Sequence, residues 1–230
     1  GNSATPDSGP WTCLAFDQRS VRRPQQSRCD IGAVELDQLP PSSTHTLTPS
    51  ANAAGWNNTN ATLTITATDQ QQASGIDRIE VVLAGAEQAT LTIQNSRGSI
   101  VIDTEGITTV TYHAVDRDGN VEPQQHTVEI KLDKTTPVTT APTLELETNV
   151  SVNNTSLPVR IRWTGTETLS GIQSYQLQQS LNGGAFGNVP RGSATSTSVL
   201  RQLTFGSSYS YRVRGKDVAG NLGAFSQGTT

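Results

Sequence analysis

The chain is short of charge and of long apolar runs. Charged residues make up 16% of its 230 residues, the formal net charge is −4, and no run of basic residues occurs. This balance argues against nucleic acid or an anionic membrane surface as the partner. No apolar stretch approaches the roughly 20 residues that a transmembrane helix needs, so we expect no membrane span.

Aromatic residues are scarce as well, at 5% of the chain. Sandwiches that bind carbohydrate normally present exposed aromatic side chains on one sheet or loop. Of the three tryptophans, Trp163 is expected in a core and Trp11 in the N-terminal segment. Trp56 is therefore the one candidate for contact with a ligand from a loop, and the general scarcity weighs against a sugar platform.

The motifs of catalysis are missing too. The sequence has no nucleophile elbow, no His-Glu-x-x-His and no glycine-rich phosphate loop. One histidine, His45, is predicted in a linker, while His113 and His126 are predicted near each other in two strands of one hairpin. That pair lacks a third metal ligand, so we expect solvent-facing strand residues. The sequence predicts no catalytic residue, no enzyme activity and no organic cofactor.

Methionine is absent, and cysteine occurs only twice. Because the chain begins Gly-Asn-Ser, we expect a processed or excised piece of a longer protein. Cys13 and Cys29 both lie in the first 36 residues, and an even count favours a disulfide, with a free pair in a reducing compartment as the alternative. Such a bond closes a loop of about 16 residues, which stabilises the fold by roughly 3 kcal/mol.

Two pairs of matching strings are the most informative feature that is present. Residues 67–79 match residues 165–175 around a shared Ser-Gly-Ile string. Residues 112–120 match residues 213–221 around a shared Gly-Asn string. The Ser-Gly-Ile strings lie 96 residues apart and the Gly-Asn strings 101, which is the period of a β-sandwich module. Abundant Thr, Ser, Gly, Asn and Gln favour strands over helices. We predict an all-β fold of two tandem β-sandwiches.

Alternation of apolar and polar residues places the strands of the first module. Gly119-Asn120 marks a hairpin turn because both residues tolerate positive φ, and Tyr112 is expected to point into the core. In the second module we expect strands at 157–163 and 174–180, the latter followed by an Asn182-Gly183-Gly184 turn. The strands predicted in the first module are 61–67, 76–83, 89–93, 98–102, 108–115 and 126–132.

The first module, residues 46–136, resembles the bacterial immunoglobulin-like repeats of secreted surface proteins. The resemblance is carried by Trp56-Asn57-Asn58-Thr59, by the Glu105-Gly106 turn and by Val110 through Asn120. It implies an immunoglobulin-like sandwich.

The second module, residues 137–230, resembles a fibronectin type III domain. Leu157 through Trp163 stands where that family has its second strand and core tryptophan. Residues 203–209 match the family's tyrosine corner, which implies that the Tyr209 hydroxyl bonds to backbone. Further along, Tyr211 and Val213 continue the buried face, while Arg212, Arg214 and Lys216 alternate outward.

Residues 1–38 differ from the rest of the chain. Asp17 through Pro24, leading to Cys29 through Leu36, resembles the closing segment of bacterial surface proteins with a parallel β-helix domain, except that Ser20 stands where that family usually has Gly. The resemblance implies that residues 31–36 form the last strand of a solenoid, pinned by Cys13 and Cys29. An upstream β-helix domain is then the partner of this segment. Residues 39–45, with two prolines, are predicted to be a linker.

Calcium is the ion that the sequence favours. The candidate ligands Asp69, Asp116, Asp118 and Asn120 fall at turns near one end of the first sandwich, and a hard cation takes six or more oxygen ligands. The string lacks the third acidic position and the distal Glu of a calcium loop. Asp and Asn are also the preferred turn residues, so plain turns are the alternative.

These observations predict a non-catalytic spacer and presentation region of an exported bacterial surface protein, extracellular or at the cell surface, with an adhesive or assembly-forming role. Its partner is expected to be a component of the cell envelope, a neighbouring subunit or an extracellular glycan. Two alternatives stay open. One is a glycan- or protein-binding accessory region of a secreted polysaccharide-active enzyme. The other is a subunit of an extracellular polymer, in which residues 1–38 complete another chain's sheet by strand addition.

Overall fold

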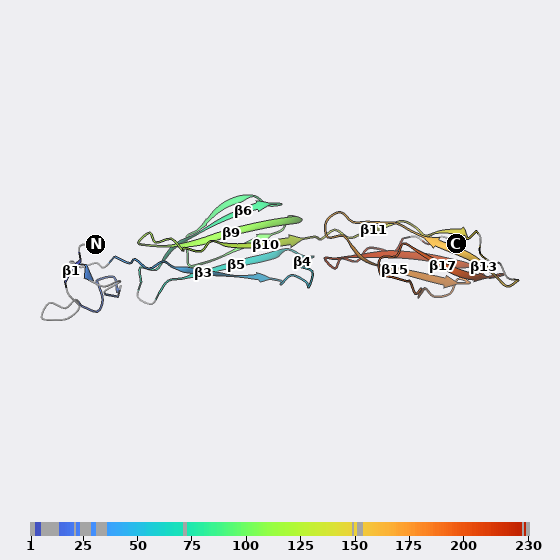
Figure 1. Cartoon of the computed structure of the whole chain (residues 1–230), viewed down its shortest axis with the longest axis horizontal. Helices are drawn as coiled ribbons and strands as arrows, with labels where there is room; N and C mark the ends of the chain where they lie inside the picture. The colour runs from blue at the N-terminus through green and yellow to red at the C-terminus, as the bar shows by residue number, and fades with distance from the viewer. Residues whose placement is uncertain are drawn as a thin grey trace. The chain divides into compact units, whose positions relative to one another are not determined.

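The computed structural model of the chain divides into two compact units (Figure 1). Unit 1 consists of residues 1–50 and 60–131, and unit 2 of residues 51–59 and 132–230. The structure describes residues 14–20, 22–23, 36–70, 73–148, 150, 154–226 and 228, and the backbone of residues 3–5 and 29–30. Within these ranges there is no helix that is long and apolar enough to cross a membrane.

Unit 1 is a β-sandwich, and its two sheets are the upper and lower layers of the blue-to-green half of Figure 1. One sheet has the order β3-β5-β8, and the other has the order β4-β10-β9-β6-β7. The first is made of β3 (Ser42–Thr48), β5 (Ala61–Thr68) and β8 (Arg97–Ile102). The second is made of β6 (Ile76–Gly85), β7 (Ala89–Ile93), β9 (Gly106–Asp116) and β10 (His126–Leu132), and its edge strand β4 (Trp56–Asn57) comes from residues 51–59.

Alternation along the strands builds the core of unit 1. In β5, Leu63 and Ile65 are fully buried, whereas the threonines between them are half-buried. Tyr112 is 1% exposed, as predicted. Each fully buried aliphatic or aromatic side chain contributes about 1.5–3 kcal/mol by leaving water. The other fully buried apolar residues of this core are Ala61, Ile79, Val81, Ile102, Val110, Ala114 and Ile130.

Strand β3 starts inside the stretch that was predicted to be a linker. Ser43 pairs with Ala67 and Thr48 with Thr62, so the strand lies along the whole of β5. Pro40 and Pro41 come directly before it, and neither can donate a hydrogen bond to a ladder. The prolines therefore fix where the strand begins, while the Ser and Thr residues after them are free to pair.

Unit 2 is also a β-sandwich. Its main sheets have the orders β12-β13-β17 and β16-β15-β18, and β11 pairs with β14. The strands are β11 (Val138–Thr139), β12 (Thr143–Leu146), β13 (Ser156–Arg162), β14 (Gly165–Thr166), β15 (Ile172–Leu181), β16 (Gly187–Asn188), β17 (Ser198–Thr204) and β18 (Tyr209–Asp217). All described pairings in this unit are antiparallel.

The predicted core tryptophan lies in the core of unit 2. Trp163 is 3% exposed and packs edge-on against Tyr175, with 6.0 Å between the ring centroids. Tyr211 and Val213 are fully buried beside them. The fold class predicted from the sequence, all-β with two tandem sandwiches, is confirmed.

The N-terminal segment contributes one short antiparallel pair, β1 (Ser3–Thr5) with β2 (Cys29–Asp30). The predicted solenoid strand at 31–36 lies outside the described residues except for Leu36, and so does the Cys13–Cys29 disulfide. Ser20, where the similar family usually has Gly, has a φ of +66°. That value is in the left-handed region, which favours glycine, so the turn forms here in spite of the substitution.

The tyrosine corner of unit 2 takes the predicted form. The backbone N–H of Thr204 donates to the Tyr209 hydroxyl oxygen over 3.0 Å. We expect Tyr209→Phe to lower the free energy of unfolding by about 1 kcal/mol, because the variant loses this hydrogen bond and little packing. Urea unfolding of the full chain measures the change. Tyr175→Phe is the matched control, and a loss for the control as large as that for Tyr209→Phe would refute the corner's contribution.

Candidate functional site

Two of the four predicted calcium ligands meet at one end of unit 1, together with a third aspartate. Asp37, just before β3, and Asp116, at the end of β9, are each 1% exposed. One carboxylate oxygen from each of Asp37, Asp69 and Asp116 lies within 4.8 Å of the other two. Two oxygens on one Ca²⁺ at 2.3–2.6 Å are at most about 5 Å apart. The separation therefore admits one shared ion.

Backbone hydrogen bonds hold these carboxylates in place. Asp37 accepts from the N–H groups of Ser74 at 2.8 Å and Leu39 at 3.0 Å. Asp69 accepts from the N–H of Gly75 at 2.8 Å. The Ser-Gly turn found in the sequence thus closes directly on two of the three acids.

The Gly-Asn turn supplies the other side of the arrangement. The side-chain amide of Asn120 donates to the Asp37 carbonyl oxygen at 2.8 Å and to Asp116 Oδ2 at 2.7 Å. Asp116 Oδ1 accepts from the backbone N–H groups of Asp118 and Asn120. The amide nitrogen of Asn120 joins the entry residue Asp37 to the turn, and a role of Asn120 as a metal ligand stays a prediction. We call this set of contacts the entry clamp.

The fourth predicted ligand, Asp118, is directed to other partners. Its carboxylate accepts from Arg19 at 2.9 and 3.2 Å and from the backbone N–H of Asp37 at 2.9 Å. The Arg19 hydrogen bond lowers the pKa of Asp118, against a smaller opposing effect of burial. Asp118 therefore ties the N-terminal segment to unit 1, and it is not one of the three clustered acids.

A second entry clamp stands at the same place in unit 2. The Asn221 amide donates to the Asp133 carbonyl oxygen at 2.7 Å and to Asp217 Oδ2 at 2.9 Å. Asp133 accepts from the N–H groups of Ser170 and Thr135, and Glu167 accepts from the N–H of Gly171. Asp133 and Asp217 are fully buried. The two matching strings in the sequence are thus the two loops of a repeated device.

The sequence reasoning missed the entry residues themselves. Asp37 and Asp133 are 96 residues apart, the same interval as the Ser-Gly-Ile strings, and each is followed four residues later by a proline, Pro41 or Pro137. That shared Asp-x-x-x-Pro spacing is the signal that could have found them.

Burial and, to a smaller extent, neighbouring carboxylates raise the pKa of Asp69 and of Asp133. Burial raises the pKa of Asp69, backbone hydrogen bonds from Gly75 and Gln70 oppose the rise, and the charges of Asp37 and Asp116 add to it. Burial likewise raises the pKa of Asp133, hydrogen bonds from Ser170 oppose it, and Asp217 and Glu167 add to it. A shared proton or a cation would relieve this repulsion.

The three histidines form polar contacts, and the side chains of His113 and His126 are 22% and 24% exposed. His45 lies in β3, with Nδ1 2.6 Å from the Tyr112 hydroxyl oxygen. The ring of His126 stacks on Tyr112 at 5.1 Å, and its Nε2 lies 2.9 Å from Glu122 Oε1. His113 contacts Glu80 instead, at 3.2 Å. The side chains of His113 and His126 thus have different partners, and their closeness stays a prediction.

Glu122 is the buried centre of this network. It accepts from the Ser43 N–H at 2.7 Å, from the Ser43 hydroxyl at 2.5 Å and from the Ala114 N–H at 3.0 Å. Burial raises the pKa of Glu122, but the hydrogen bonds from Ser43, His126 and Ala114 outweigh it and leave the pKa lowered. The Ser43 backbone N–H and hydroxyl both donate to Glu122, so this buried pair joins β3 to the segment that follows β9.

The other predicted contact residue, Trp56, is held by its own loop. Its backbone N–H donates to the Asn52 side chain at 3.0 Å, and its carbonyl oxygen accepts from the Asn52 N–H at 2.8 Å. The ring is only partly buried. A role in ligand contact stays a prediction.

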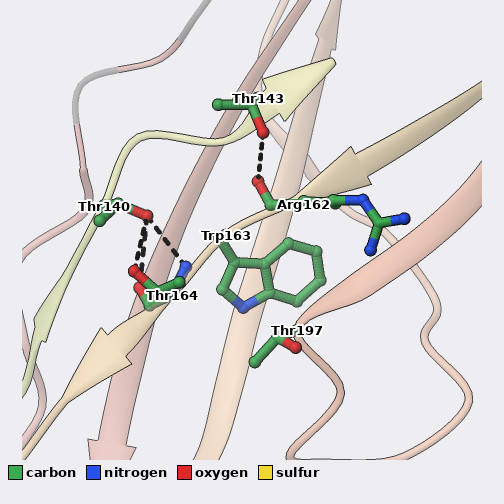
Figure 2. Close-up of a pocket in the computed structure, with 6 residues that line it drawn as sticks. All are labelled: Thr140, Thr143, Arg162, Trp163, Thr164 and Thr197. Atoms are coloured by element: carbon green, nitrogen blue, oxygen red, sulfur yellow. Dashed lines mark hydrogen bonds between the residues drawn. The ribbon is translucent and has the colours of Figure 1, made fainter. Parts of the chain in front are cut away.

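A pocket of about 450 Å³ lies beside Trp163 in unit 2 (Figure 2). Its polar groups are engaged within the fold: Thr140 bonds to Thr164, and the Thr143 hydroxyl donates to the Arg162 carbonyl oxygen. Among the residues that the structure describes, none is a hydrogen-bond partner of the indole Nε1 of Trp163, and this atom is buried out of reach of solvent. The pocket thus offers a ligand few free polar contacts.

Comparisons with known proteins establish the fold and leave the family open. No protein-family model and no curated protein matches the chain. Domains A168–A170 of titin match with 18% identity over 86% of this chain and 67% of that one, at a TM-score of 0.55.

Two further solved structures fall below a TM-score of 0.5. A 1.5-MDa bacterial ice-binding adhesin, studied for host cell surface retention, matches with 16% identity over 84% of this chain and 66% of that one, at 0.40. The fibronectin(III)-like modules of CbhA from Clostridium thermocellum match with 14% identity over 80% and 90%, at 0.33. Of the three, the titin match supports tandem immunoglobulin- or fibronectin III-like sandwiches, and at this identity it supports the fold alone.

We expect Asn221→Ala to destabilise the chain by about 2 kcal/mol, because the buried Asp133 carbonyl and Asp217 carboxylate lose their shared donor. Urea unfolding of the full chain measures this. The exposed Asn154→Ala is the control and should change the free energy of unfolding by less than about 0.5 kcal/mol. Equal effects of the two substitutions would contradict the clamp.

The raised pKa of Asp69 gives a pH dependence with a definite sign. A group whose pKa is higher in the folded chain favours folding at low pH and loses that contribution as pH rises through the folded value. Without divalent ions, the melting temperature of Asp69→Asn minus that of the wild type should therefore increase as pH rises from acid to neutral. Differential scanning calorimetry with EDTA measures both chains. A difference that stays constant with pH would disprove the repulsion.

Proposed function

We propose that this chain is a non-catalytic spacer and presentation region of an exported surface protein. The observation that carries the proposal is the recurrence of one entry clamp in two sandwich units. In each, an aspartate just before the first strand of its unit is fixed by backbone N–H groups and an asparagine amide. These contacts fix the first residues of each unit to its loops, which a module under mechanical tension requires.

The chemistry of the described residues supports a structural role. The buried acids Asp116, Glu122 and Asp217 each accept hydrogen bonds from backbone N–H groups and from neighbouring side chains, and these bonds stabilise a turn or a strand. A catalytic carboxylate faces a cavity where a substrate can reach it. These acids are instead inside the sandwich ends, where they add rigidity.

Light scattering on a sizing column tests the proposal with the full chain. A spacer is expected to stay monomeric over a wide range of concentration, because its units bury their own cores. Mass that rises with concentration would overturn the spacer role and favour the polymer alternative, in which residues 1–38 pair with another chain.

A second candidate function is the binding of a hard cation at Asp37, Asp69 and Asp116. The observation that favours it is their 4.8 Å grouping, without an arginine, lysine or histidine partner for any of the three among the described residues. We propose Ca²⁺ as the ion, since carboxylate oxygens are its ligands. A bound ion would stiffen the start of unit 1.

Calcium titration tests this candidate. Addition of Ca²⁺ should raise the melting temperature of the wild type in proportion to log concentration once the site is saturating. Asp69→Asn, which keeps one oxygen but loses the charge, should respond less, and Asp77→Asn, outside the cluster, should respond like the wild type. The absence of any Ca²⁺-dependent shift in the wild type would rule the site out.

A further inference from the structure

Unit 2 carries an excess of positive charge although the whole chain is negative. Residues 132–230 contain eight Lys and Arg against five Asp and Glu, while the net charge of the chain is −4. Of the five acids, Asp133, Glu167 and Asp217 belong to the entry clamp. Glu145 lies on β12, and Glu147 comes directly after that strand. On the other sheet, Arg212, Arg214 and Lys216 occupy alternate positions of β18.

Two arginine pairs of this unit have the same spacing and opposite surroundings. On β13, Arg160 and Arg162 are two residues apart and point to one face. Arg160 Nε donates to Glu147 at 2.5 Å, and Arg162 Nε donates to Glu145 at 3.0 Å. The two glutamates are themselves two residues apart on an extended segment. This first pair is neutralised.

The second pair, Arg212 and Arg214 on β18, is stacked on aromatic rings. The guanidinium carbon of Arg212 lies 4.1 Å from the ring centroid of Phe186 and 4.2 Å from that of Phe225. Arg214 lies 4.3 Å from the same Phe225 ring. Rings and guanidinium groups thus alternate in the order Phe186, Arg212, Phe225, Arg214.

Hydrogen bonds to glutamines fix the same two side chains. Arg212 Nε donates to Gln178 Oε1 at 2.9 Å, and Arg214 Nε donates to Gln176 Oε1 at 2.7 Å. Both glutamines in turn donate to Asn188 Oδ1, at 2.8 and 3.1 Å. The arginines are therefore held in place before any ligand arrives, which lowers the entropy that binding would cost.

What remains available on each arginine is its outer edge. Neither Arg212 nor Arg214 forms an ion pair within the described part of the chain, and Nε is the only nitrogen of each that has a hydrogen-bond partner there. Their Nη groups remain as donors in the plane of a fork that matches a carboxylate. Lys216, exposed at the next outward position of β18, extends the row.

We propose that the Arg212–Arg214 face binds an extended acidic segment of a partner protein, with carboxylates on alternate residues. Unit 2 itself contains the template for this contact, since Glu145 on β12 and Glu147 just after it neutralise Arg162 and Arg160. Side chains two residues apart on an extended chain are about 6.6–6.8 Å apart, the spacing of the two arginines along β18. The two glutamate carboxylates of an extended Glu-x-Glu peptide therefore have the spacing to pair with the guanidinium groups of Arg212 and Arg214 at the same time.

The aromatic rings decide between this ligand and a neutral sugar. A sugar stacks on an uncovered ring face, but Phe225 has a guanidinium group within 4.3 Å of its centroid from each of two arginines, and Phe186 is covered by Arg212. The rings serve to orient the cations, and the exposed chemistry is that of N–H donors. Charge complementarity thus selects an anion.

Fluorescence anisotropy with labelled peptides and the full chain tests the inference. A peptide that alternates Glu and Ser is expected to bind, and a peptide of the same composition with its glutamates in blocks is expected to bind several-fold more weakly. Arg212→Gln with Arg214→Gln should weaken binding of the alternating peptide by about tenfold or more, equivalent to at least about 1.4 kcal/mol. Binding should also weaken with added salt.

The matched control is Arg160→Gln with Arg162→Gln, which removes the same charge from the opposite sheet and should leave binding unchanged. Arg212→Lys with Arg214→Lys keeps the charge and loses the fork, so an intermediate loss is expected. Circular dichroism establishes that each variant is folded. Equal losses in the two glutamine variants, equal binding of the two peptides, or no binding at all would overturn the proposal.

A polyanion of another class is the remaining outcome. Polygalacturonate presents carboxylates on a sugar chain and is used as the competing probe. If it binds to the Arg212–Arg214 face and the alternating peptide does not, the acidic-peptide partner is refuted and an anionic polysaccharide takes its place.

Discussion

The burial of one aspartate at the entry of each sandwich unit is the constraint on which the unit's loop end depends. A carboxyl group that leaves water costs several kcal/mol unless hydrogen bonds replace its solvation. The carboxylates of Asp37 and Asp133 obtain them from the Ser-Gly loop, and the backbone carbonyl oxygens of the same residues accept from the Gly-Asn turn. Loops far apart in sequence are thus closed on one residue, and the end of the sandwich is set by polar contacts and not by apolar packing.

Much of the fold was predictable because its signals are local. Alternation in β5 and β9, the turn at Gly119-Asn120 and the tyrosine corner at Tyr209 each follow from residues within a few positions of one another. Trp163 and Tyr112 were placed in cores for the same reason. The period of 96 to 101 residues then gave the number of sandwiches.

The site was predicted only in part, because its contacts are long-range. Asp69 and Asp116 were predicted to be ligands and lie together, but the third acid is Asp37, whose partners are up to 83 residues away. Asp118 looked like a ligand by its position in the turn, yet its carboxylate is bound by Arg19, 99 residues away. His126 was expected in solvent, since nothing in the sequence pairs it with Tyr112 and Glu122.

The position of the entry aspartate also determines where a fragment that contains one unit has to begin. Asp37 stands five residues before β3 and Asp133 five residues before β11, so a boundary drawn at the first strand of either unit discards the residue on which its loops close. A fragment of unit 2 that begins at Val138 would leave the amide of Asn221 with Asp217 alone and the N–H of Ser170 without its Asp133 acceptor. A faithful fragment has to keep a few residues that belong to no strand.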